Sequence, residues 1–509
     1  MIPSPKQDGR PRRPAASAPV VLASGHGKAR PTRRTVQTLG GVCALAGVVL
    51  LTACGSLAPR RAQPDAPAST AHLAARVQVA TASDDLRRGE RARLLHHVQS
   101  EGRPDLVKRH LAAMTAQDRV RLSADNDVHL LVDGPQTFAA MFKAVEAARR
   151  SIWLESYIIE DADIALRLRD LLIRKRSEGV PVHVIYDAVG SIGTSRDFFQ
   201  SLRDAGVHTC AFNPINPLTR PGYWGINHRD HRKILVVDEQ LAFTGGINIS
   251  KVYSSGSSLF SKNKKGKDPD GDGKDNGWRD TQIQVNGPAA AEMARIVRQT
   301  WDAQGCKPAI DAAVTTGADP KGGQKRGDKV LQVIISGPDE GGMDTYVSLL
   351  TALDAAQESI HITMAYFAPG QDMVQALCDA AQRGVEVQLI LPSISDFSPV
   401  LYAGRSYYQQ LLSAGVKLYE LDSAVLHAKT VVVDGVWSTV GSSNMDWRSF
   451  VSNNEINVVV LGRDFGQSME ALFQQDLRSS TAIDPEGWKD RSLLEKLKEK
   501  GARLFERLM

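Results

Sequence analysis

Apolar and polar residues change period along the chain in a regular order. Segments with helical spacing at Phe138 to Ala148 and Ile164 to Arg176 alternate with short apolar runs at Ile152 to Ile158 and Val180 to Tyr186. Helical segments alternating with buried runs predict βαβ units around a central sheet. This part of the chain is therefore expected to form an α/β domain.

The same order of periods returns about two hundred residues later. The corresponding segments are Tyr346 to Gln357, Ile360 to Tyr366, Met373 to Gln382 and Val385 to Leu391. Short stretches of text repeat with them: Ala-Ala-Arg-Arg-Ser-Ile at 147–152 answers Ala-Ala-Gln-Glu-Ser-Ile at 355–360. An internal duplication predicts two similar α/β domains related by a pseudo-twofold axis.

A set of polar residues around one strand of each half is also duplicated. The first set is His231, Lys233, Asp238, Gly246 and Asn248, and the second is His427, Lys429, Asp434, Ser442 and Asn444. The spacings are identical, and on a strand each His and its Lys would project from one face. A single His-x-Lys is weak evidence, whereas two matching copies indicate paired half-sites.

Two such half-sites suit the chemistry of a phosphodiester. Its anionic phosphorus resists attack, so an enzyme must neutralise charge, supply a nucleophile and protonate the leaving alkoxide. Two lysines and two asparagines can hold the nonbridging oxygens, while one histidine attacks phosphorus and the other transfers the proton. This set requires neither a metal nor a cofactor, and we expect none.

The repeated pattern H-x-K-x4-D-x6-G-(G/S)-x-N resembles the signature of the phospholipase D superfamily. Flanking text is similar to its bacterial cardiolipin synthase branch, including Y-F-A-P at 366–369, G-R-S-Y-Y at 404–408 and N-M-D-W-R-S-F at 444–450. The resemblance extends from about Val128 to Thr481. It implies two phospholipase D-like α/β domains, each a mixed sheet flanked by helices, with the active site at their interface.

The resemblance also implies roles for individual residues. His231 would be the nucleophile and His427 the acid and base, although the reverse order stays open. The family places an acid downstream of each motif, and the matches are Asp280 and Glu455. Such an acid would accept a hydrogen bond from the other ring nitrogen of a histidine.

The remaining motif residues are expected to support the substrate or the backbone. Asp238 and Asp434 stand at strand turns and are predicted to fix the backbone. Gly246, Ser442 and Ser443 are placed at the substrate-binding surface, where the serines would donate hydroxyl groups and the glycine cannot. The two half-sites are therefore not equivalent.

Several functions are compatible with this reading. The resemblance favours a phosphatidyltransferase that acts on glycerophospholipids, phosphatidylglycerol above all. Alternatives are a hydrolase that releases phosphatidic acid, a nuclease, and an inactive lipid-binding module. The complete motifs disfavour the inactive module. An apolar entrance to the active site that excludes water would favour transfer of the phosphatidyl group over hydrolysis. Its candidate aromatic residues are Tyr223, Trp224, Tyr366, Phe367, Tyr407 and Tyr408.

The N-terminal residues 1–53 predict an export signal of the lipoprotein type. A basic segment precedes an apolar core at Leu39 to Leu51, and L-T-A-C then resembles a lipobox with Cys54 as the lipidation site. An uncleaved anchor is the alternative. The predicted location is the periplasmic face of a bacterial cell envelope, and the Gly55 and Ser56 that follow favour the outer membrane.

Removal of this signal changes the charge of the chain. Residues 1–53 contain eight of the 62 Lys and Arg and one of the 57 acids, which leaves 54 basic and 56 acidic residues. The net charge of +5 thus becomes −2, and no basic footprint for nucleic acid remains. Because both motifs lie in one chain, a monomer is expected.

The other segments divide as follows: 54–80 a tether, 81–127 a helical extension, 128–310 domain 1, 311–330 a linker, 331–482 domain 2, and 483–509 a C-terminal amphipathic helix. That helix either packs on the body or rests on a membrane, and its balanced charge favours packing. The insertion at Tyr253 to Gly277 is read as a polar loop, with a calcium loop at Asp268 to Asp272 as the minor alternative. The three cysteines after Cys54 are too few to predict a disulfide framework.

Overall fold

The computed structural model describes residues 69–100, 103–116, 120–214, 227–255, 257, 277–308, 325–338 and 342–508. The predicted signal segment, Cys54, Tyr223, Trp224 and the loop at Asp268 to Asp272 lie outside these residues. None of the helices that are described combines the length and the apolarity needed to cross a membrane.

The first half follows the predicted alternation of helices and strands. Its strands are β2 (Arg121–Val132), β3 (Ile152–Ser156), β4 (Val182–Asp187), β5 (His208–Phe212), β6 (Lys233–Val237), β7 (Leu241–Gly245), β8 (Trp278–Arg279) and β9 (Thr281–Asn286). Its helices are α5 (Asp133–Ala147), α6 (Asp163–Ser177), α7 (Arg196–Asp204), the short η1 (Lys251–Tyr253) and α8 (Pro288–Ala303). Apolar residues at helical spacing bury one side of each helix, as Leu168, Leu171 and Leu172 do in α6.

The second half repeats this order. Its strands are β10 (Lys329–Ser336), β11 (Ser359–Met364), β12 (Phe367–Ala368), β13 (Glu386–Pro392), β14 (Lys417–Leu421), β15 (Val425–Leu426), β16 (Lys429–Val433), β17 (Trp437–Gly441), β18 (Met445–Asp446), β19 (Glu455–Leu461) and β20 (Ser480–Ala482). Its helices are α10 (Asp344–Ala355), α11 (Gly370–Gln382), α12 (Ser398–Arg405), α13 (Tyr408–Ser413), the π-helix η4 (Arg448–Ser452) and α14 (Arg463–Leu477).

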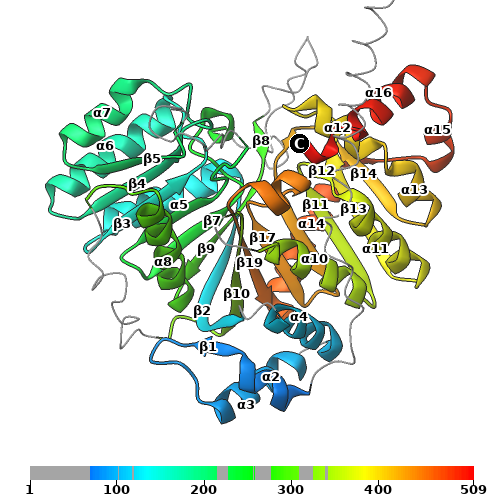
Figure 1. Ribbon diagram of the computed structural model, residues 1–509, viewed down its shortest axis with the longest axis horizontal. Helices are drawn as coiled ribbons and strands as arrows, with labels where there is room; N and C mark the ends of the chain where they lie inside the picture. Colours follow the sequence, from blue (N-terminus) through cyan, green and yellow to red (C-terminus); the bar gives the residue numbers. More distant parts are fainter. Residues whose placement is uncertain are drawn as a thin grey trace, which may run out of the picture. The chain divides into compact units, whose positions relative to one another are not determined.

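The two half-sheets join edge to edge into one mixed sheet (Figure 1). Read outward from its centre, the first half runs β2-β9-β7-β6-β3-β4-β5, and the second runs β10-β19-β17-β16-β11-β13-β14. Each strand of one half thus has its counterpart at the same place in the other. The predicted pair of duplicated α/β domains is observed, with β2 and β10 paired antiparallel at the junction.

The N-terminal extension packs on the second half. Its elements are α2 (Thr70–Arg76), β1 (Gln78–Ala80), α3 (Arg88–Ser100) and α4 (Pro104–Ala116). Leu106, Val107 and Leu111 of α4 share one apolar core with Leu349 and Leu353 of α10. Helices α3 and α4 lie in the predicted helical extension at 81–127, whereas α2 and β1 lie in the stretch at 54–80 that was predicted to be a tether. The half that the extension covers was not predicted. The extension also passes directly into the sheet, because β2 begins at Arg121 and not at 128.

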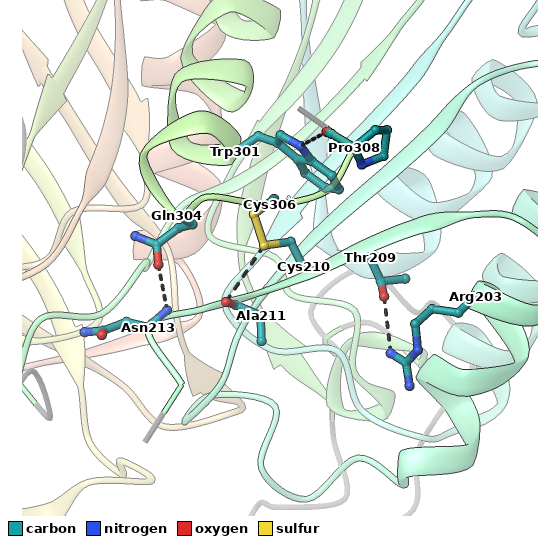
Figure 2. Close-up of a disulfide and its surroundings, with 9 residues drawn as sticks. All are labelled: Arg203, Thr209, Cys210, Ala211, Asn213, Trp301, Gln304, Cys306 and Pro308. Atoms are coloured by element: carbon teal, nitrogen blue, oxygen red, sulfur yellow. Dashed lines mark hydrogen bonds between the residues drawn. A yellow bond between two sulfur atoms is a disulfide. The ribbon is translucent and has the colours of Figure 1, made fainter. Parts of the chain in front are cut away.

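A disulfide joins Cys210 and Cys306, with 5.7 Å between the Cα atoms (Figure 2). It ties β5 to the turn that follows α8, 96 residues further along the chain. The cysteine count predicted no disulfide framework, and this single bond was not predicted. Sequence spacing gave no signal, because the fold brings the two segments together. Cys378 is free and buried.

The C-terminal residues form α15 (Pro485–Lys489), α16 (Leu493–Arg503) and a 3-10 turn, η5 (Glu506–Leu508). Helix α16 lies against α12 at the right of Figure 1. It packs on the body, as its balanced charge favoured, but the side turned inward is the polar one. Glu499 is only 5% exposed, whereas Leu493 and Leu497 are 79% and 65% exposed.

Candidate active site

Each motif histidine lies two residues before its strand, and the opposite half holds its backbone. The His231 amide donates to the Asn454 carbonyl at 2.9 Å, and the His427 amide donates to the Arg279 carbonyl at 2.8 Å. Parallel pairing of β8 with β15 supports the second contact. Both half-sites therefore depend on the junction between the halves, and the prediction that the histidines stand inside the strands is off by two residues.

The downstream acids cross between the halves. Nδ1 of His231, in the first motif, lies 3.0 and 3.1 Å from the two carboxylate oxygens of Glu455, which belongs to the second half. Nδ1 of His427 lies 2.8 Å from Oδ2 of Asp280, which belongs to the first half. A carboxylate beside Nδ1 keeps a proton on that nitrogen and leaves Nε2 free to react. The two histidines thus share one kind of arrangement, built from exchanged acids.

Burial sets the charge state of both histidines. Burial away from solvent is the main cause that holds the pKa of His231 well below 6.5, and the positive charges of Lys233 and Lys429 lower it further. Burial and Lys429 also lower the pKa of His427, while the Asp280 carboxylate raises it. His231 is thus the imidazole more strongly biased toward the neutral, nucleophilic form, and His427 has the closer support for an added proton.

The two motif lysines are buried beside their histidines. The Lys233 ammonium donates to the His231 carbonyl at 2.6 Å, and the Lys429 ammonium donates to the His427 carbonyl and lies 2.9 Å from His427 Nδ1. Burial lowers the pKa of Lys233 to about 7 and that of Lys429 to about 8. An anion bound beside them would favour the ammonium forms again.

The motif aspartates face away from this centre. The Asp238 carboxylate accepts hydrogen bonds from the amides of Arg149, Arg150 and Ser151. The Asp434 carboxylate accepts the equivalent bonds from residues 357–359. These amides belong to the repeated text Ala-Ala-x-x-Ser-Ile, so each aspartate fixes the entry to the neighbouring strand, β3 or β11. Neither contacts a motif histidine.

Gly246 and Ser442 occupy equivalent places and serve the acids. A Cβ at Gly246 would lie 2.2 Å from Oδ1 of Asp280, so only glycine lets this carboxylate approach. The Ser442 hydroxyl donates to the Glu455 carboxylate at 2.5 Å. In the structure these two residues lie against Asp280 and Glu455, and their role at the substrate-binding surface stays a prediction.

Ser443 and the two asparagines lie in the same buried region. Oδ1 of Asn248 accepts from the Ile158 amide at 3.1 Å, and its side chain also bonds the Tyr253 hydroxyl. Oγ of Ser443 and Oδ1 of Asn444 are buried without a hydrogen-bond partner among the described residues. These two atoms keep the capacity to bond a substrate.

Aromatic side chains surround the histidines, and among the described residues they share only Tyr366 with the predicted set. Tyr366 lies edge-on to His427, and its hydroxyl donates to Asp396 at 2.7 Å. Phe367, Tyr407 and Tyr408 are instead core residues, with at most 3% exposure. Three other aromatic residues contact the histidines: Tyr157, Tyr253 and Trp278.

Tyr253 contacts a motif histidine and was not among the residues predicted for the site. Its hydroxyl lies 3.0 Å from Nδ1 of His427, and the side chain is 1% exposed. It was assigned to the polar insertion at Tyr253 to Gly277. The available signal was its place five residues after Asn248, still inside the region that the motif organises.

The end of the considered calcium loop is part of the core. Arg279 would hold the twelfth position of that loop, and its guanidinium instead forms paired hydrogen bonds of 2.8 Å with Asp476. Within the described ranges, no group of three or more His, Cys, Asp or Glu side chains is placed to hold a metal ion. The loop residues themselves lie outside those ranges.

The family model described as "Cardiolipin synthase, PLD-like domain" matches residues 141–256 and 349–477. The cardiolipin synthase of Alkalihalophilus pseudofirmus is 34% identical over 76% of this chain and 73% of its own length. A cardiolipin synthase of Listeria monocytogenes is 32% identical over 78% of this chain and 79% of its own.

A solved structure shows the same fold at low identity. The phosphatidylserine synthase of Haemophilus influenzae superposes with a TM-score of 0.55 and 14% identity, over 75% of this chain and 95% of that protein. The duplicated sheet, the paired half-sites and the sequence matches all indicate the same family. The chain is an enzyme of the phospholipase D superfamily and belongs to its bacterial cardiolipin synthase family.

Proposed function

We propose that this protein transfers a phosphatidyl group from one glycerophospholipid to an alcohol, with His231 as nucleophile and His427 as acid and base. The observation that carries the proposal is the crossed pairing of each imidazole with a buried carboxylate from the other half. Such pairing fixes both Nδ1 protons and directs both Nε2 atoms to chemistry.

The reaction then follows in two balanced steps. Nε2 of His231 attacks phosphorus, the bond from phosphorus to the leaving alkoxide breaks, and Nε2 of His427 gives its proton to that oxygen. In the second step His427 takes the proton of the incoming hydroxyl, whose oxygen attacks phosphorus while the phosphorus–nitrogen bond breaks. Glu455 and Asp280 stabilise the imidazolium charge that forms on each ring in turn.

The buried cations and amides would hold the phosphate. Lys233 and Lys429 neutralise the nonbridging oxygens, since anion binding restores ammonium groups whose pKa burial has lowered to about 7 and 8. Ser443 adds a buried hydroxyl without another partner among the described residues. The role of these residues is charge stabilisation and not proton transfer.

Phosphatidylglycerol is the proposed donor and acceptor, which gives cardiolipin and glycerol as products. The family assignment supports this choice, because the relatives named above are cardiolipin synthases. Hydrolysis to phosphatidic acid is the competing outcome, since water intercepts the intermediate unless a lipid headgroup is better held.

Mass spectrometry of the products separates the two outcomes. Purified protein with phosphatidylglycerol in mixed micelles should yield cardiolipin and glycerol, with phosphatidic acid as a minor product. The His231→Ala variant serves as the blank. Phosphatidic acid dominating at every lipid density, undiverted by added glycerol, would replace the transferase proposal with a hydrolase.

We further propose that the mature protein is anchored to the periplasmic side of the envelope, in the outer membrane, through a diacylated Cys54. The Cys210–Cys306 disulfide supports export independently of the N-terminal text, because such bonds persist in oxidising compartments. Metabolic labelling with palmitate should modify the wild type and not Cys54→Ser. Palmitate incorporation that survives Cys54→Ser would exclude this anchor.

A further inference from the structure

The most exposed large apolar side chains of the described residues gather in a few segments. Six belong to the C-terminal segment: Leu493, Leu494, Leu497, Leu504, Phe505 and Leu508, which are 57% to 79% exposed. At 3.6 residues per turn the three that belong to α16, Leu493, Leu494 and Leu497, span an arc of about 100°, and the other three follow in the turn after α16 and in η5. We call these six residues the leucine face.

The leucine face is held outward by the packing of the opposite side. Glu499 is buried and bonds Arg491 at 2.7 Å, and Glu506 accepts a hydrogen bond of 2.6 Å from the Tyr407 hydroxyl. Arg503 lies over the Tyr407 ring at 4.2 Å. The polar side of this amphipathic segment is thus buried in the body, and its apolar side meets the surroundings. A helix that only completes the core would have the reverse orientation.

The segment is also connected to the second half-site. Ala502 and Tyr366 both pack on the small apolar cluster of Ala368, Val400 and Ala403, and Tyr366 contacts His427. Arg507 lies 5.5 Å from the ring of Trp447, three residues after Asn444. The segment that carries the leucine face therefore packs against residues that adjoin the second half-site.

Two further exposed apolar residues follow equivalent strands of the two halves. Ile192 is 75% exposed in the loop after β4, where the neighbouring Ser191 bonds the carbonyl of Tyr157, the residue beside His231. Phe397 is 45% exposed in the loop after β13, next to Asp396, which bonds Tyr366. Each half-site thus has an exposed apolar residue nearby.

The charges beside the leucine face fit an anionic lipid surface. Lys498, Lys500 and Arg507 are exposed, while Glu499 is buried and Glu506 is half-buried against Tyr407. Glu495 forms an ion pair with Lys498, so these two side chains add no net charge, and the positive charge beside the face comes from Lys500 and Arg507. An apolar stripe flanked by cations is the pattern of a helix that lies in a membrane interface.

We propose that the leucine face docks the enzyme onto a bilayer that contains anionic phospholipid, so that the site meets lipid without extraction of the substrate into water. The proposal rests on the proposed function for its purpose, since a phosphatidyl substrate resides in such a bilayer. It does not depend on the lipid anchor at Cys54, which acts through a different segment. The occupant of this face is therefore a lipid surface and not a second protein.

The test removes the anchor and measures docking and turnover separately. In a Cys54→Ser background, the full mature chain should sediment with vesicles of phosphatidylglycerol and phosphatidylethanolamine, and less with neutral phosphatidylcholine vesicles. The triple variant L494S/L497S/L504S should lose roughly tenfold or more of its vesicle partitioning. Because these side chains are exposed, its thermal unfolding should match the parent. The matched control L494F/L497F/L504F keeps the face apolar and should keep binding.

Turnover on two forms of substrate separates docking from catalysis. The serine variant should lose activity on vesicles roughly in proportion to lost binding, yet retain activity on dispersed short-chain phosphatidylglycerol. Unchanged vesicle binding by that variant would overturn the docking proposal. A parent dimer that the serine variant dissociates, with vesicle binding unaltered, would assign the face to a second copy and also overturn it. Vesicle binding without turnover of either substrate would uphold docking and defeat the proposed function alone.

Discussion

The two half-sites have the same skeleton but meet their acids in different ways. In the first half, Gly246 clears space for the Asp280 carboxylate, and in the second, Ser442 donates a hydroxyl to Glu455. Each acid then serves the histidine of the other half. The two halves therefore provide similar backbone frameworks. They form one site because each half supplies the acid that contacts the histidine of the other half.

The environments of the histidines differ as a result. His427 is in contact with a carboxylate, the Tyr253 hydroxyl and the Lys429 ammonium, whereas His231 faces a carboxylate and the edge of the Tyr157 ring. The Asp280 carboxylate favours the protonated ring of His427, as a group that gains and loses protons requires, and a neutral buried imidazole suits attack. The asymmetry favours His231 as the nucleophile, and the following experiments test it.

Replacing either histidine should have the largest effect. His231→Ala and His427→Ala should each reduce transfer by on the order of 10⁴-fold or more, because the proposed reaction passes through both. A phosphatidyl ester of p-nitrophenol distinguishes them, since this leaving group departs without a proton. His427→Ala should then regain release of p-nitrophenol, and His231→Ala should not. Recovery in His231→Ala alone would reverse the assigned roles.

Replacing the acids should have the next largest effect. Asp280→Asn and Glu455→Gln should each lower kcat/KM by about 100-fold, or about 2.7 kcal/mol, because the imidazolium loses its counter-charge. Loss of the Asp280 charge also lowers the pKa of His427 and Lys429, whose protonated forms are active. The alkaline limb of kcat/KM should therefore move to lower pH. A limb that moves to higher pH would contradict this account.

Glu455→Gln makes the same comparison on the first half-site. The Glu455 carboxylate raises the pKa of Lys233, which burial lowers to about 7. Its removal should move the loss of the ammonium form, and with it the rise in KM, to lower pH. The pH profiles of the two variants, measured with one lipid, would show whether each acid governs its crossed partner.

Changes at Gly246 and Ser442 test the different ways in which the acids are held. Gly246→Ala places a Cβ 2.2 Å from Asp280 Oδ1 and should displace that carboxylate, at a cost of roughly tenfold or more in kcat. Ser442→Ala removes one hydrogen bond from Glu455 and should cost roughly tenfold or less. In the Asp280→Asn background, Gly246→Ala should add little further loss, since both act through Asp280. Full additivity would mean that Gly246 acts elsewhere.

Sequence patterns specified what is local in this fold and little of what joins distant segments. Helical spacing predicted the helix at Ile164 to Arg176, which is α6 at Asp163–Ser177, and repeated text located both motifs. The crossed acids were not specified, because a duplicated sequence relates each acid equally to its own histidine and to the other one. The disulfide between residues 96 apart and the contact of α4 with the second half likewise depend on tertiary packing. The spacing of the C-terminal leucines indicated an amphipathic helix, but it did not indicate which side of the helix would be buried.

The smallest expected effect concerns Tyr253, which lies five residues after Asn248. The second half has no tyrosine at the equivalent place, because Ser449 lies five residues after Asn444. Its hydroxyl lies 3.0 Å from His427 Nδ1 and also bonds Asn248, so it links the two motifs. The Asp280 carboxylate is the stronger partner for that nitrogen, and loss of the hydroxyl should change kcat only a few-fold. Tyr253→Phe keeps the buried ring and should therefore unfold at the parent temperature. If the hydroxyl orients His427, the loss should appear in transfer to alcohol and disappear with the p-nitrophenyl ester, whose leaving group needs no acid. An equal loss with both substrates would place Tyr253 with the nucleophile's half-site instead, and the contrast between the two histidines would then need another cause.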